Sequence, residues 1–150
     1  MVFGMFKKVL KAGAKEIQAD YSQNRDYLEA VCASAALVAA ADGDIEDSER
    51  IKTVKIISAH PTLSKFYTSA VIEQTAETMF KRAKDVSGRQ MLARELDDIK
   101  TLENGKQMAE DVYLIALDVA GADGEIEPQE TEVLKKIANR LGVNASDFEF

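Results

Sequence analysis

The chain has 150 residues, 46% of them hydrophobic and 30% charged, which is typical of one soluble globular domain. Its net charge of −7 argues against nucleic acid as the main partner, because phosphate binding needs a basic face. The one cysteine, Cys32, excludes a disulfide within the chain, and the one histidine, His60, argues against a histidine-rich zinc or copper site. The single cysteine fits a reducing, cytoplasmic compartment, which is the location we expect. No stretch approaches the roughly 20 apolar residues of a membrane-spanning helix.

Residues 2–17 are predicted to form an amphipathic helix. Apolar side chains recur at three- and four-residue spacing, and lysines fall largely on the other side. This pattern is typical of a helix on an anionic membrane surface. It makes the following residues candidates for docking on a membrane or a partner: Phe3, Phe6, Lys7, Lys8, Lys11 and Lys15. The alternative is a terminal helix packed on its own domain, with solvated lysines. We divide the chain into this N-terminal segment, 1–20, and a main helical domain, 21–150.

Two helices joined by an acidic turn are predicted next. Residues 25–41 carry an apolar stripe at helical spacing and many alanines, which favour helix. Cys32 lies in this stripe, so we interpret it as a small buried hydrophobe and not as a nucleophile. The second helix is predicted over 47–59 and to end at His60-Pro61, since the residue before a proline is pushed away from helical angles. The His60 imidazole would then complement the dipole at that helix C-terminus.

A long helix is predicted over residues 62–86, with a basic end that suits the helix dipole. Ser87-Gly88 indicates a break or kink. The shorter helix expected after it has apolar residues spaced i, i+4 and i+7, at Leu92, Leu96 and Ile99.

Residues 106–122 follow a predicted turn at Asn104-Gly105 and are apolar on most sides, which indicates a central, buried helix. Asp118 lies within it, and a buried carboxylate there would have to be paired or bind a cation. A last long helix is predicted over 128–141.

The predicted fold is therefore all-α, with about seven helices and no sheet. Residues 25–60 and 105–142 form two helix–turn–helix units that we interpret as a pseudo-two-fold duplication, joined by 62–103.

The duplication is clearest in two acidic turns, at residues 41–49 and 122–130. The motif Ala-Asp-Gly-x-Ile-x-x-x-Glu occurs in both, at an offset of 81 residues. Carboxylate-rich loops suit hard divalent cations such as Ca²⁺, Mg²⁺ and Mn²⁺. The local charge also supports a cation, because the carboxylates sum to −5 within residues 41–49 and to −6 within 118–132.

The spacing of each turn matches the second half of an EF-hand loop, which has glycine at position 6, an apolar residue at 8 and glutamate at 12. In the first acidic turn these are Gly43, Ile45 and Glu49, but positions 1 and 3 fall on Val38 and Ala40, which carry no side-chain ligand. Each turn is thus half a site. Two half-sites that face each other would complete a shared shell.

Helix capping explains part of the same pattern without a metal. Asp-Gly is an ordinary helix-ending turn. With Glu127 as N-cap, Pro128 falls at N1, where proline is favoured, and Glu130 at N3, the capping-box position.

The paired motifs and the helical runs around them, over residues 25–145, resemble the TerB family of tellurite resistance proteins. The resemblance implies an all-helical domain whose acidic residues chelate metal. Carried over to this chain, it makes the candidate metal ligands Asp42, Asp44, Glu46, Glu49, Asp123, Glu125, Glu127 and Glu130. It also implies a bacterial stress response that protects against tellurite, some phages and pore-forming colicins. Such proteins are thought to work with an integral membrane protein, TerC, at the inner membrane, so a peripheral membrane location is expected.

The leading functional hypothesis is a non-enzymatic module that binds or senses a divalent cation. The alternative is a metal-independent adaptor whose acidic face binds a basic protein surface. An enzyme is not supported, because the sequence contains no nucleophile–base motif or phosphate-binding loop, and one cysteine cannot form a two-thiol reductase.

Overall fold

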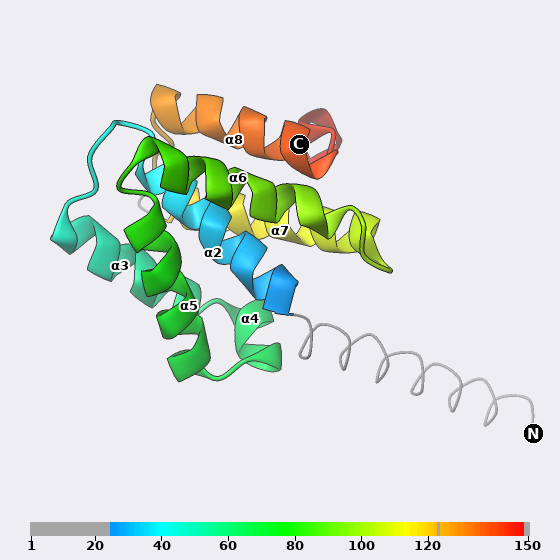
Figure 1. Cartoon of the computed structure of the whole chain (residues 1–150), viewed down its shortest axis with the longest axis horizontal. Helices are drawn as coiled ribbons and strands as arrows, with labels where there is room; N and C mark the ends of the chain where they lie inside the picture. Colours follow the sequence, from blue (N-terminus) through cyan, green and yellow to red (C-terminus); the bar gives the residue numbers. More distant parts are fainter. Residues whose placement is uncertain (1–24, 123, 149–150) are drawn as a thin grey trace, which may run out of the picture.

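The computed structural model describes residues 25–122 and 124–148, and every regular element in these ranges is helical (Figure 1). The predicted all-α fold is confirmed. In chain order the elements are α2 (Arg25–Ala39), α3 (Asp47–Ser58), α4 (Pro61–Phe66), α5 (Ser69–Arg82), α6 (Val86–Ile99), α7 (Gly105–Ala120), α8 (Pro128–Leu141) and the 3₁₀ helix η1 (Ala145–Phe148). The helix predicted over residues 2–17 lies outside the described residues.

Helix α2 is the centre of the bundle. It packs against α3, α5, α6, α7 and α8 (Figure 1). All of its alanines are buried, and such small side chains let neighbouring helices approach closely. The prediction that 106–122 would be the central helix was wrong, because α7 keeps Leu114 and Asp118 exposed on one side.

The residues predicted as one helix over 62–86 form two helices. Tyr67 is extended, with φ −134° and ψ 151°, and it separates α4 from α5. Thr68 then acts as the N-cap of α5, since its hydroxyl accepts a hydrogen bond from the Val71 amide at 3.3 Å. A threonine cap overrides a helical pattern that runs through both segments.

The next break lies at residues 83–85, not at Ser87-Gly88 as predicted. The Asp85 carboxylate accepts the Gly88 amide at 2.6 Å and caps α6. Gly88 is buried in the first turn of α6, where a Cβ would lie 1.7 Å from the Arg82 carbonyl oxygen. This glycine therefore serves a close backbone approach and does not end a helix.

His60 and Asp118 also differ from the predictions. His60 is the N-cap of α4, with its Nδ1 accepting from the Thr62 amide at 3.3 Å, so it begins a helix where we expected it to end one. Its Nε2 lies 2.9 Å from an Asp118 carboxylate oxygen, and the Asp118 side chain is 66% exposed. Asp118 is thus paired, as expected, but at the surface of the bundle.

Helix α3, which follows the first acidic turn, is held against α5 by a part-buried ion pair. Nη1 of Arg50 donates to both carboxylate oxygens of Glu77 at 2.6 Å. Val54 and Ile57 of the same helix are buried, whereas Ile51 is 46% exposed.

None of the helices formed by residues 25–122 and 124–148 combines the length and apolar character required to cross a membrane.

Candidate functional site

The two acidic turns have the same backbone hydrogen bonds. In the first turn the Ala41 amide donates to Val38 at 3.1 Å and the Gly43 amide to Ala40 at 3.0 Å. The counterparts in the second turn are Ala122 to Val119 at 3.3 Å and Gly124 to Gly121 at 3.0 Å. Gly43 has φ +100° and Gly124 φ +96°, in the left-handed region that favours glycine. The recurring glycines are therefore required by the turn itself.

Both turns lead into their helices in the same way. Glu46 and Glu127 are the N-caps of α3 and α8, with extended ψ values of 149° and 153°. The Glu130 carboxylate accepts the Glu127 amide at 3.0 Å, as the capping interpretation predicts, and Pro128 occupies the first helical position. Local capping thus accounts for Pro128 and for one oxygen of Glu130.

The two acidic turns border the same cleft. A cleft of about 290 Å³, which we call the inter-turn cleft, lies between them. Four carboxylates line it, two from each half of the chain, together with Gln129 and the end of α2: Asp42, Glu49, Glu127, Glu130, Gln129, Val38 and Ala39. The facing arrangement that the half-sites require is therefore present for four of the eight predicted ligands.

The other four predicted ligands are not among the described residues that line the cleft. Asp44, Glu46 and Glu125 are exposed at the surface. Asp44 still contributes to the first turn, because its amide donates to Asp42 Oδ1 at 3.4 Å. Asp123 lies outside the described residues.

The inter-turn cleft is an electronegative site. Its described lining contains four carboxylates and no lysine or arginine. A sphere of 290 Å³ is about 8 Å across, and two carboxylates at that separation repel by about 0.5–2 kcal/mol for an effective dielectric between 80 and 20. A divalent cation in the cleft would relieve this repulsion.

The carboxylates of the cleft are not drawn together into a tight ligand set. Across the described part of the chain, three acidic, histidine or cysteine side chains have ligand atoms within 4.8 Å of one another at one place, formed by Asp26, Glu29 and Glu95. A cation in the cleft would keep part of its water shell, as Mg²⁺ usually does, or draw the side chains inward.

Comparison with known proteins supports the assignment that these turns suggest. The family model described as tellurite resistance protein TerB matches residues 28–150, which is most of the chain and includes both acidic turns. The chain belongs to the TerB family. No curated protein and no solved structure matches it. The resemblance to TerB proteins that the paired motifs carry is thereby confirmed, and with it a role in the tellurite-resistance family.

The Asp26, Glu29 and Glu95 group of this TerB domain was not predicted. Asp26 and Glu29 share a face of α2 through their i, i+3 spacing, but the sequence contains no signal that α6 brings Glu95 beside them. Burial and the neighbouring Glu29 raise the pKa of the Glu95 carboxyl, and Arg82, 3.7 Å away, opposes that shift. The group lies at the α2–α6 contact, away from the residues of the inter-turn cleft.

Cys32 is buried within α2 of the TerB domain, as predicted. Burial, with a smaller contribution from Glu29, raises the pKa of its thiol to about 12. Since the thiolate is the reactive form of cysteine, burial and the raised pKa both argue against Cys32 as a nucleophile at neutral pH.

Proposed function

We propose that this TerB-family chain binds one divalent cation in the inter-turn cleft and acts as a non-enzymatic module in the response to tellurite, phage or colicin stress. The observation that carries the proposal is that Asp42 and Glu49 line the same cleft as Glu127 and Glu130. Hard cations such as Ca²⁺, Mg²⁺ and Mn²⁺ prefer carboxylate oxygens. Because the cation would be bound by both halves of the chain, its affinity would depend on their relative position.

A calorimetric titration of the purified chain with CaCl₂, MgCl₂ and MnCl₂ tests the proposal. Because each turn is half a site, we expect one ion per chain. Glu130→Gln should weaken binding while it preserves the cap, since glutamine also fills the N3 position of a capping box. Glu125→Gln on the same turn is the matched control, because Glu125 does not line the cleft. Two ions per chain, or equal effects of the two variants, would contradict a shared site.

A metal-independent adaptor is the second candidate. The observation in its favour is that no three of the described carboxylates of the cleft lie within 4.8 Å of one another. An acidic face of this kind would bind a basic protein surface through complementary charge. Charge reversal at Glu46 and Glu127 would then weaken a pull-down of the partner equally with and without a chelator, whereas the cation hypothesis predicts that the chelator alone weakens it.

The proposed partner is an integral membrane protein of the TerC type, at an anionic membrane surface. What supports this is the basic amphipathic pattern of residues 2–17 and the membership of the chain in the TerB family. Co-sedimentation with vesicles that contain anionic lipid, with and without residues 1–20, tests the membrane part. Equal sedimentation of the two chains would remove the N-terminal segment from the proposal.

A further inference from the structure

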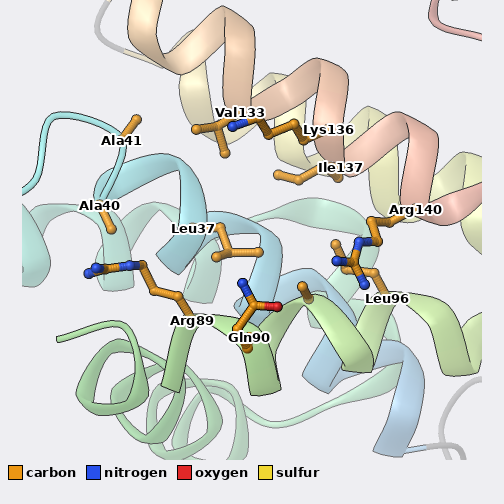
Figure 2. Close-up of a pocket in the computed structure, with 11 residues that line it drawn as sticks. Leu37, Ala40, Ala41, Arg89, Gln90, Leu96, Val133, Lys136, Ile137 and Arg140 are labelled. Atoms are coloured by element: carbon orange, nitrogen blue, oxygen red, sulfur yellow. The ribbon is translucent and has the colours of Figure 1, made fainter. Parts of the chain in front are cut away.

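A second hollow of the TerB domain lies between α6 and α8, with the end of α2 as its floor (Figure 2). We call it the α6–α8 groove. It has a volume of about 320 Å³, at the lower end of the range for ligand-binding clefts. Its walls and floor are mainly apolar, formed by Leu37, Ala40, Ala41, Ala93, Leu96, Val133 and Ile137.

The rim of the groove is basic, although the chain as a whole carries a net charge of −7. Arg89 and Arg140 lie at opposite sides of the groove, and Lys136 comes from α8 above it (Figure 2). Arg89 donates to the Ala83 carbonyl at 2.9 Å, and Arg140 is paired with Asp97 at 2.9 Å. Lys136 forms no ion pair with any residue in the described part of the chain. The rim therefore offers positive charge that its surroundings neutralise only in part.

The length of the groove and the spread of its charges indicate the shape of an occupant. Arg89 and Leu96 are seven residues apart on α6, and Val133 and Arg140 are seven apart on α8, so each wall runs for about 10 Å, or two helical turns. A fatty acid carries one acidic group and would leave the cations at the other end without an acidic group of the occupant. A helix with carboxylates spaced along it meets all of them.

The apolar surface also continues beyond the groove. Val86 precedes Gln90, a residue of the groove wall, by one turn of α6 and therefore lies on the same face. Its side chain is 67% exposed. The N-terminal segment of the chain itself is not a suitable occupant, because its four lysines would meet the cations of the rim.

We propose that the α6–α8 groove docks an acidic amphipathic helix of a partner protein. The apolar face of that helix, with residues at i, i+3, i+4 and i+7, lies on Leu37, Val133 and Ile137, as in other helix-in-groove complexes. Its glutamates or aspartates flank that face and pair with Arg89, Lys136 and Arg140. The proposal is independent of cation binding, since the groove and the inter-turn cleft share no lining residue.

The test uses a fluorescein-labelled amphipathic peptide of about four helical turns, with leucines at i, i+3, i+4 and i+7 and glutamates on the flanking positions. Its binding to the full chain is measured by fluorescence anisotropy at low ionic strength, and the site is mapped from backbone amide shifts. Lys136→Glu should weaken binding by about tenfold or more. The matched control is Lys135→Glu, which makes the same charge change at a neighbouring residue that does not line the groove, and it should change binding by less than about twofold.

Perturbed amide signals at Leu37, Gln90 and Val133 complete the expected result. Equal weakening by Lys136→Glu and Lys135→Glu would overturn the proposal, as would equal binding of a peptide with lysines in place of the glutamates. Binding of dodecanoate but not of the acidic peptide would assign the groove to a small anionic amphiphile and so contradict a protein partner. Self-association of the chain that buries the same residues would replace the partner by a second copy.

Discussion

Replacement of Asp42 by asparagine tests both the repulsion between the carboxylates of the inter-turn cleft and their binding of a cation. The Asp42→Asn side chain would retain the oxygen that accepts the Asp44 amide at 3.4 Å, so the turn is preserved while one of the four carboxylate charges of the inter-turn cleft is removed. Without a cation, the variant should be more stable than the natural chain, because less like charge is held together. With a cation, it should gain less stability, because one ligand has lost its charge.

The size of the effect follows from the dimensions of the cleft. Asp42 faces three other carboxylates within a volume of about 290 Å³. Because these side chains are largely solvated, the lower estimate of about 0.5 kcal/mol per pair applies, and the sum after partial screening is about 1 kcal/mol. For a domain of this size that corresponds to a rise in Tm of about 2–4 °C. Loss of one charged ligand should weaken cation binding by about tenfold, or ~1.4 kcal/mol.

Thermal unfolding followed by circular dichroism, at low ionic strength with EDTA and again with saturating CaCl₂, measures both effects. Asp44→Asn is the matched control, since it makes the same chemical change two residues away, at a side chain that does not line the cleft. The reasoning is refuted if Asp42→Asn and Asp44→Asn behave alike, or if Asp42→Asn lowers Tm in EDTA.

Three other predictions concern the interior of the bundle. With a thiol pKa of about 12, Cys32 should react with iodoacetamide at pH 8 at least about a thousandfold more slowly in the folded chain than in the chain unfolded in urea. The two rates are measured by mass spectrometry, and comparable rates would show that the thiol of the folded chain is accessible. Gly88→Ala should lower the free energy of unfolding in urea by about 2 kcal/mol or more, because a Cβ there meets the Arg82 carbonyl oxygen; a loss below about 0.5 kcal/mol would rule out the close approach. Glu95→Gln should stabilise the fold at pH 7. Because folding raises the pKa of the Glu95 carboxyl, ionisation of that carboxyl destabilises the fold as the pH rises above the unfolded-state pKa of about 4.3. The gain should vanish below that pH, and a gain that persists at pH 3.5 would exclude titration as its cause.

The sequence predicts the helical framework well, because the apolar spacing of each long helix reflects packing on one core. The stripe of residues 25–41 is buried as α2, and Cys32 lies within it as predicted. The predictions from the sequence are wrong where a polar contact decides the local structure. Thr68 ends one helical pattern and begins another, and Asp85 caps α6 three residues before the glycine that we predicted as the break.

Contacts between distant segments have no periodic signal. The sequence does not predict that Arg50 reaches Glu77 on α5, that His60 pairs with Asp118 on α7, or that Glu95 lies beside the acids of α2. Such pairs depend on how the helices cross, which the apolar spacing of a single helix does not specify.

For the candidate site, the repeated motif predicts the two turns and their capping, and the EF-hand spacing suggests that each is half a site. Which acids line the cleft is decided by the backbone of the turn. All four predicted ligands of the first turn are exposed, but Asp42 and Glu49 line the cleft, whereas Asp44 and Glu46, which lie between them in the sequence, do not. The pseudo-two-fold relation of the two halves remains a prediction, although the hydrogen bonds of the two turns agree.

The most direct test of a shared site is an NMR titration of the full chain with CaCl₂ and MnCl₂, observed at the amides of Gly43 and Gly124. These glycines occupy equivalent positions in the two turns and both have positive φ. We predict that both signals follow one binding curve, seen as chemical-shift changes with CaCl₂ and as line broadening with MnCl₂. We also predict that Asp42→Asn weakens the response of Gly124, across the cleft, as much as that of Gly43. A shared site would be contradicted if both signals stay unchanged in millimolar cation. It would also be contradicted if the two glycines follow independent binding curves and Asp42→Asn affects only that of Gly43.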